Sequence, residues 1–193
     1  MQRVSLRRRF AILALAGVGT LVALPTLGAQ ARSTCGLDSS GPLANNSYAL
    51  VYASNGKAYV CIKATSKRFV LKGASSLSDH FSLGGKWVAW SSGDTHSIVN
   101  VLYVPTRKVP DQFPFNTNDQ IDKIVVKSDG AAAWTATPVG DSTYVQGMDR
   151  RNHAPDQLSD DLEDVLGSSL RSLAGHTISW KDTDDTLHTA KLF

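Results

Sequence analysis

The chain has 193 residues, of which 42% are hydrophobic and 19% are charged, and its formal net charge is +3. This length suits one domain. The positive charge lies mostly in the first 31 residues, which hold four arginines and no acid; without them the net charge of +3 becomes −1. The charge therefore gives no ground for proposing nucleic acid or an acidic membrane as a partner.

The first 31 residues have the pattern of a secretory signal peptide. A basic start (Arg3, Arg7, Arg8 and Arg9) is followed by an apolar run from Phe10 to Leu24 and by the exit motif Ala29-Gln-Ala31. We expect a helical signal peptide over residues 1–31, cleaved after Ala31, and a secreted or cell-envelope location. The apolar run is shorter than the about 20 residues of a membrane span, so we favour a cleaved signal peptide over the alternative of an uncleaved anchor. We expect no membrane span in the mature chain. Arg7-Arg-Arg-Phe10 resembles a twin-arginine signal, which leaves two export routes open.

Two cysteines remain in the mature chain, Cys35 and Cys61, and exported proteins meet an oxidising compartment. We therefore predict a Cys35–Cys61 disulfide, with two unpaired thiols as the alternative. Closing this loop stabilises a fold by about 3 kcal/mol in the chain-entropy model.

Turn-forming residues are frequent in residues 36–47, where apolar periodicity is weak. We place an irregular arm at residues 32–44 and one repeat domain at residues 45–193. The domain opens with a hairpin whose turn is Ser54-Asn-Gly-Lys57, because Asn-Gly favours a two-residue turn. Ser-x-x-Lys is also a nucleophile motif of penicillin-recognising enzymes, but that motif belongs at a helix start.

An apolar run that ends in an aromatic residue recurs along this domain. The aromatic residues Tyr52, Trp90, Trp134 and Trp180 follow one another at intervals of 38, 44 and 46 residues. A polar turn and a second strand-like run follow each of them, and further short strands precede them, giving up to four strands per repeat. A period of about 40 to 45 residues in such a sequence is typical of a β-propeller blade.

The predicted fold class is therefore all-β, a small or incomplete β-propeller of about four repeats of antiparallel strands. Residues 160–168 are the one helical stretch expected in the mature chain, since Leu158, Leu162 and Val165 share a helical face. Residues 108–115 contain Pro110 and Pro114 and read as a connector or a poorly bonded outer strand.

No catalytic, cofactor-binding or metal-binding residues are predicted. The histidines lack zinc spacing. Asp182-Thr-Asp-Asp185 lacks the order of a calcium loop and is better explained as a polar hairpin turn. Fingerprints for nucleotide binding or for a nucleophilic serine are absent from the sequence.

One stretch resembles a known repeat family. Ser128-Asp-Gly-Ala-Ala-Ala-Trp134, followed by Tyr144-Val-Gln-Gly-Met-Asp-Arg150, is similar to the repeats of TolB-like (WD40-like) β-propellers. Residues 83–107 and 173–192 look like weaker copies. The resemblance implies a propeller fold and a binding surface, and it carries over no catalytic residue. The family usually has six or more blades, whereas about four repeats fit here.

These observations favour a secreted, non-enzymatic binding or structural module without cofactors, whose partner is an extracellular or envelope protein. The alternative is a small secreted hydrolase or lactonase-like enzyme with a site in the central channel. The fourth repeat has three expected strands. We therefore expect incomplete closure, with two arrangements: a four-unit propeller-like monomer in which the arm held by Cys35 and Cys61 covers the open edge, which we favour, or an open arc that pairs with a second chain.

Overall fold

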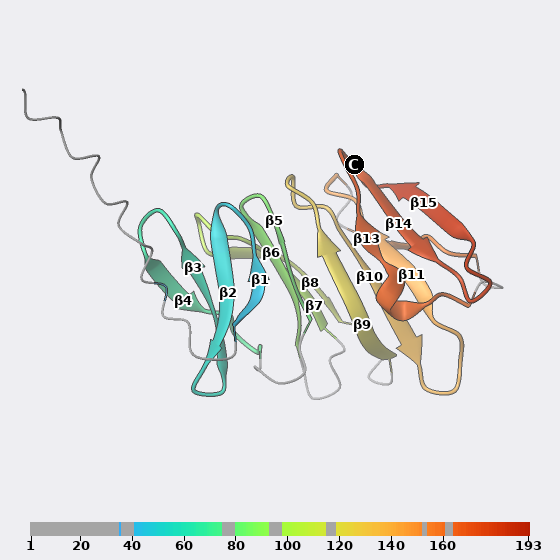
Figure 1. Ribbon diagram of the computed structural model, residues 1–193, viewed down its shortest axis with the longest axis horizontal. Coiled ribbons are helices and arrows are strands. Elements are labelled where there is room, and N and C mark those ends of the chain that lie inside the picture. The colour runs from blue at the N-terminus through green and yellow to red at the C-terminus, as the bar shows by residue number, and fades with distance from the viewer. Residues whose placement is uncertain are drawn as a thin grey trace, which may run out of the picture. The chain divides into compact units, whose positions relative to one another are not determined.

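A computed structural model describes residues 35, 41–74, 80–92, 98–114, 119–151, 154–160 and 164–193, with side chains uncertain over 108–114. The chain divides into two units, Met1–Arg32 and Ser33–Phe193. The signal peptide and cleavage site expected in the first unit lie outside the described residues. No helix in the described ranges is long and apolar enough to cross a membrane. The described part of the second unit is built almost wholly of β-strands, which confirms the all-β fold class (Figure 1).

The first sheet is antiparallel and contains β1 (Pro42–Asn45), β2 (Ala49–Ser54), β3 (Lys57–Ile62) and β4 (Lys67–Val70), in that order. Asn55 and Gly56 form the β2–β3 turn with φ angles of 51° and 70°, as predicted for a two-residue hairpin. β1 lies partly within the stretch assigned to an irregular arm. Its register shifts between Pro42 and Ala44, which suits a proline at the start of a strand with one neighbour.

The second and third sheets repeat this order of strands. The second contains β5 (Phe81–Gly84), β6 (Trp87–Ser92), β7 (Ile98–Tyr103) and β8 (Lys108–Pro114). The third contains β9 (Asp119–Val126), β10 (Ala132–Pro138), β11 (Tyr144–Met148) and β12 (Pro155–Gln157). Each strand pairs with the next in sequence, so each sheet is one consecutive stretch of chain. β8 is the outer strand expected near Pro110 and Pro114.

The fourth sheet has three strands, β13 (Arg171–Ser172), β14 (Thr177–Lys181) and β15 (Leu187–Lys191). The helix predicted over residues 160–168 is wrong where the structure describes it. Val165 is instead bridged to Asp182, and the backbone N–H of Leu166 donates to the carbonyl of Lys181. A single turn of 3-10 helix, η1 (Gly167–Ser169), follows. Pairing with β14 satisfies this backbone and overrides the local helical pattern.

The sheets follow one another in a row through their first strands. β1 contacts β5, β5 contacts β9, and β9 contacts β13. Within the second unit, the first and fourth sheets lie at opposite ends of this row (Figure 1). The four repeats thus form an open row.

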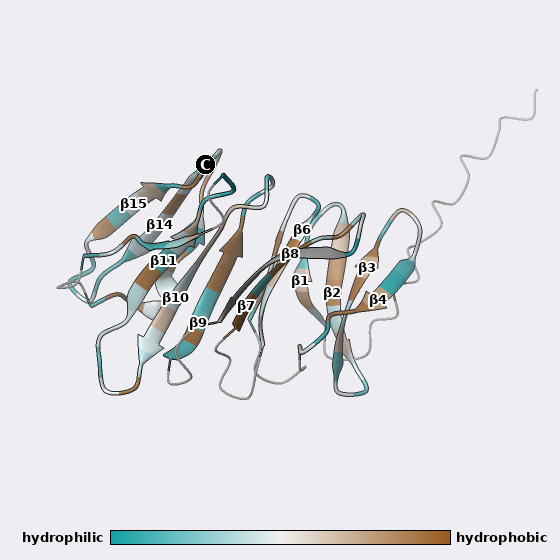
Figure 2. Cartoon of the chain, turned by 180° about the vertical axis from the view of Figure 1, so that it is seen from behind, coloured by the Kyte–Doolittle hydropathy of each residue, from teal (hydrophilic) through white to brown (hydrophobic). Residues whose placement is uncertain are grey.

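Apolar side chains between neighbouring sheets form the core, and the hydrophobic segments of β6 and β9 contrast with the hydrophilic β4 in Figure 2. Trp90, Trp134 and Trp180 are 1%, 0% and 3% exposed. Each lies on the second strand of its sheet and packs towards the preceding sheet. The prediction that these three residues occupy equivalent buried positions is confirmed.

Candidate functional site

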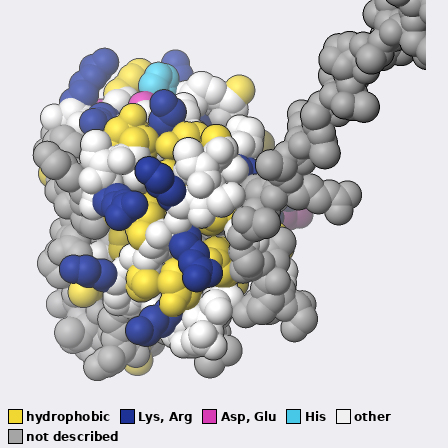
Figure 3. All heavy atoms as spheres, turned by 90° about the vertical axis from the view of Figure 1, so that its left-hand side faces the viewer, with side chains coloured by type: hydrophobic (Ala, Val, Ile, Leu, Met, Phe, Trp, Pro, Cys, Tyr) yellow, Lys and Arg dark blue, Asp and Glu magenta, His cyan; other side chains and the backbone are white. Residues whose placement is uncertain are grey.

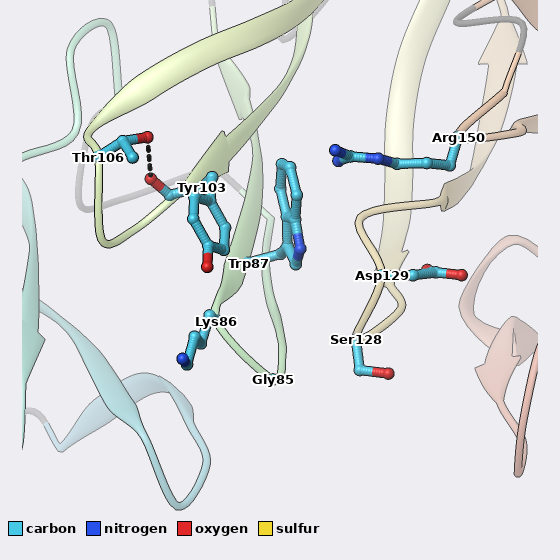
Figure 4. A pocket seen from close by; sticks show the side chains of 8 residues that line it. All are labelled: Gly85, Lys86, Trp87, Tyr103, Thr106, Ser128, Asp129 and Arg150. Atoms are coloured by element: carbon cyan, nitrogen blue, oxygen red, sulfur yellow. Dashed lines mark hydrogen bonds between the residues drawn. The ribbon is translucent and has the colours of Figure 1, made fainter.

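A cavity of about 660 Å³ opens between the second and third sheets (Figure 4). We call it the Trp87 pocket. Its lining consists of Gly85, Lys86, Trp87, Tyr103, Thr106, Ser128, Asp129 and Arg150. A volume of this size falls within the range of small-molecule sites.

Three turns, the ends of β6 and β7, and the segment after β11 position these residues. The β5–β6 turn supplies Lys86, the turn after β7 supplies Thr106, and the β9–β10 turn supplies Ser128 and Asp129. Arg150 follows β11. Antiparallel hairpins place these segments at the same edge of the two sheets, which we call the turn edge.

Trp87 forms the apolar centre of the pocket. Its ring lies 4.8 Å from the ring of Tyr103, and the guanidinium of Arg150 lies over it at 4.4 Å from the centroid. Gly130 makes this stack possible, because a Cβ atom there would lie 2.8 Å from both Trp87 and Arg150. The φ angle of +101° at Gly130 also favours glycine.

The polar rim of the pocket is mainly cationic. In the described part of the chain, neither Lys86 nor Arg150 forms an ion pair. Asp129 is already engaged, since its Oδ2 lies 2.9 Å from Nδ1 of His176 and its Oδ1 accepts the backbone N–H of Ala131 at 3.1 Å. The two cations therefore leave charge available for an anionic ligand.

The structure confirms the predicted disulfide and places it away from this pocket. Cys35 and Cys61 are bonded, with 5.8 Å between their Cα atoms. They pack with Leu50 and Tyr52 on the face of the first sheet that points away from the second. A disulfide indicates an oxidising, extracytoplasmic environment.

Asp182-Thr-Asp-Asp185 lies in the β14–β15 hairpin, as predicted. Asp182 pairs with His188 at 3.0 Å and Asp185 with Lys181 at 2.8 Å. The hydrogen bond with His188 holds the pKa of Asp182 below its usual value. Among the described residues, no group of three His, Cys, Asp or Glu side chains is placed to hold a metal ion.

A second cavity, of about 320 Å³, has an acidic lining that includes Asp141 and Asp160. Tyr144 also lines it and donates from its hydroxyl to Oδ2 of Asp119 at 2.8 Å. Burial, and then this hydrogen bond, raise the pKa of Tyr144 above its usual value, so its hydroxyl stays protonated at neutral pH. Its hydroxyl group thus links β11 to β9 through this hydrogen bond.

Sequence reasoning did not find the Trp87 pocket. Trp87 falls in the second of the repeats recognised from the sequence, whereas Gly130 and Arg150 fall in the third. The available signal was the glycine that precedes each tryptophan-centred run, such as Gly85 and Gly130. These glycines mark the turns that line the pocket, but they do not show which turns lie next to one another in the fold.

No family model matches the chain, and no curated protein matches its sequence. Solved structures do match its fold. The computationally designed Ika4 protein is 14% identical, covering 81% of this chain and 94% of its own, with a TM-score of 0.57. The WD40 repeats of RRP9 are 11% identical over 77% of this chain, with a TM-score of 0.54. Dipeptidyl peptidase 4 of Porphyromonas gingivalis is 9% identical over 73%, with a TM-score of 0.53.

The similarity concerns the fold alone. The chain spans 44% of the RRP9 structure and 29% of the peptidase structure. The fold is of the WD40-like β-propeller type, as expected from the repeats. A fold of this type does not by itself assign a function.

Proposed function

We propose that this chain is an exported, non-enzymatic binding module of the TolB-like repeat type, and that the Trp87 pocket is its ligand site. The observation that carries the proposal is the pair of cations, Lys86 and Arg150, on the rim of a cavity with an aromatic centre. Lys86 and Trp87 come from the second repeat, and Arg150 from the third.

Three features support an extracytoplasmic binding role. The signal-like residues 1–31 favour export. The Cys35–Cys61 disulfide suits an oxidising compartment. Neighbouring turns hold the pocket in shape, because Asn46 donates to the carbonyl of Gly85 at 3.0 Å and Asp129 pairs with His176. A preformed pocket loses less conformational entropy on binding.

Capture from native extracellular and envelope fractions tests this proposal. The protein would be immobilised as wild type, as the double variant Lys86→Glu/Arg150→Glu, and as Arg151→Glu. Arg151 is a matched control, since it is next in sequence but stacks on Phe193 at 5.5 Å instead of lining the pocket. Lys86 and Arg150 are exposed, so charge reversal there should leave the fold intact.

A component retained by the wild type and by Arg151→Glu, but not by the double variant, is the expected result. Equal retention on all three proteins would place binding elsewhere. Failure of the wild type to retain any component from either fraction would contradict the binding role.

A further inference from the structure

The Trp87 pocket also has features that select among ligands. Resting on the proposed function, we propose that it binds monoanionic aromatic carboxylates, in which a flat ring sits against Tyr103 and the carboxylate lies on the rim that carries Lys86 and Arg150. Either a free aromatic acid or the C-terminal aromatic residue of a peptide has this chemistry.

The charges favour one negative group. Lys86 lies to one side of Trp87 and Arg150 reaches towards it from the opposite side (Figure 4). The guanidinium carbon of Arg150 lies 4.4 Å from the centroid of the Trp87 ring, and the guanidinium N–H groups are donors that a carboxylate can bind. Asp129 lies on the same rim and repels more highly charged anions. A carboxylate therefore fits this rim better than a doubly charged phosphate.

The aromatic side chains favour a flat apolar group. Trp87 is 6% exposed and Tyr103 is partly exposed beside it, so Tyr103 offers the accessible ring. Rings pack favourably at centroid separations of about 4.5 to 7 Å. Thr106 holds the loop next to Tyr103 by donating to the Tyr103 carbonyl at 3.5 Å. A ligand ring placed against Tyr103 thus contacts a side chain whose position is held by the turn that follows β7.

The stack of Gly130, Trp87 and Arg150 gives the site a defined shape. Gly130 lies against one edge of the Trp87 ring, where any side chain would collide with both partners. Arg150 is also fixed through its backbone, because its N–H donates to the carbonyl of Phe193 at 2.7 Å. The cation is therefore held near the ring before a ligand arrives.

Isothermal titration of the purified full chain tests this ligand class. The probes are 2-naphthoate, its neutral isostere 2-naphthamide, and the peptide Ala-Ala-Phe with a free or an amidated C-terminus. We expect both carboxylates or one of them to bind, and the matching amide to bind at least about tenfold more weakly. The carboxylate that binds more tightly identifies the source, free acid or peptide. Arg150→Gln should weaken carboxylate binding by about tenfold, whereas Arg151→Gln should leave it unchanged.

Equal affinity for acid and amide, or an unchanged affinity in Arg150→Gln, would overturn the proposal. Absence of binding by every probe at millimolar concentration would overturn it as well. None of these outcomes decides the proposed function. The capture experiment that tests it uses native components and makes no assumption about the chemistry of the ligand. If the capture experiment fails while the titration succeeds, the Trp87 pocket is still a carboxylate site. The proposal of a native extracellular or envelope partner is then rejected.

Discussion

At the residue scale, the equivalent tryptophans differ in how their indole N–H groups are satisfied. Trp134 donates from Nε1 to Oε1 of Gln146, which faces it across β10 and β11, at 3.2 Å. Asn100 occupies the matching place opposite Trp90, but its amide donates to Oγ of Ser92 at 2.7 Å. Nε1 of Trp90 and Nε1 of Trp180 have no hydrogen-bond partner in the described part of the chain.

Replacement of each tryptophan by phenylalanine should reveal this difference. Trp134→Phe leaves Gln146 without its indole donor, whereas Trp90→Phe removes a buried N–H that has no partner. We expect Trp134→Phe to lower the free energy of unfolding by about 1 kcal/mol more than Trp90→Phe does. Denaturant unfolding measures both, with Trp180→Phe as the second unpartnered case. A larger loss for Trp90→Phe would contradict the hydrogen-bond argument.

Lys127 is a buried cation that joins the third sheet to the fourth. Its side chain is 4% exposed, and Nζ donates to Oγ of Ser172 at 3.0 Å and to the carbonyls of Leu173 and Thr177 at 2.6 and 2.9 Å. Burial lowers the pKa of Lys127 below its usual value, although the charge of Asp129 opposes the shift.

This lowered pKa gives a signed prediction for stability against pH. Between the folded pKa of Lys127 and the unfolded value of 10.5, the unfolded chain binds more protons. The free energy of unfolding should therefore rise with pH in this alkaline window, relative to a Lys127→Met variant that lacks the group. At neutral pH, Lys127→Met should lose about 1 to 3 kcal/mol, because three acceptors lose their donor. Parallel pH profiles of the two proteins would contradict the assignment.

At the element scale, Cys35 packs on the side of the first sheet where the other sheets have a preceding sheet. Trp90, Trp134 and Trp180 each pack against the sheet before their own, whereas Tyr52 has no such sheet. Tyr52 stacks on Tyr59 at 5.5 Å, and Cys35 packs against it through the bond to Cys61. Tyr52 is nevertheless only 1% exposed. The disulfide thus holds Cys35 against the outer side of the first sheet.

Removal of this disulfide should mainly destabilise the first sheet. We expect Cys35→Ser/Cys61→Ser to lower the free energy of unfolding by about 3 kcal/mol. Hydrogen exchange should quicken at the amides of β2 and β3 before those of β10 and β14. Uniform acceleration over all four sheets would show that the bond stabilises the molecule as a whole and does not act locally.

The sequence predicted the repeated strands because each is marked by local signals. The apolar run before Trp90, Trp134 or Trp180 and the Asn55-Gly56 turn need no knowledge of distant residues. β1 was missed because Pro42 and few apolar residues mark it, and its place depends on pairing with β2. The Trp87 pocket was missed for a related reason. Gly85 and Arg150 are 65 positions apart, and only the stacking of sheets brings their turns together.

At the scale of the whole second unit, basic side chains lie on the outer faces of both end sheets of the row. Residues 41–74 contain five Lys or Arg and no acid. Figure 3 shows Lys and Arg side chains gathered over hydrophobic ones at the first-sheet end. The strand register places Arg68 on this face, since it lies opposite Cys61. At the other end, Arg171 and Lys191 lie on the face of the fourth sheet opposite to Trp180.

The open row and its like-charged ends predict how copies of the chain behave towards one another. Closing a ring from two copies would bring Arg68 of one near Arg171 and Lys191 of the other, and like charges brought together are unfavourable. Light scattering should therefore give a monomer mass at low ionic strength, where repulsion is least screened.

Arg68→Glu makes the two ends complementary and should increase self-association. Lys123→Glu, on β9 within the row, makes the same change of charge away from the ends and should leave the mass unchanged. A wild-type dimer that persists on dilution at low salt would show that contacts between the end sheets outweigh this repulsion, and would favour a ring of two copies.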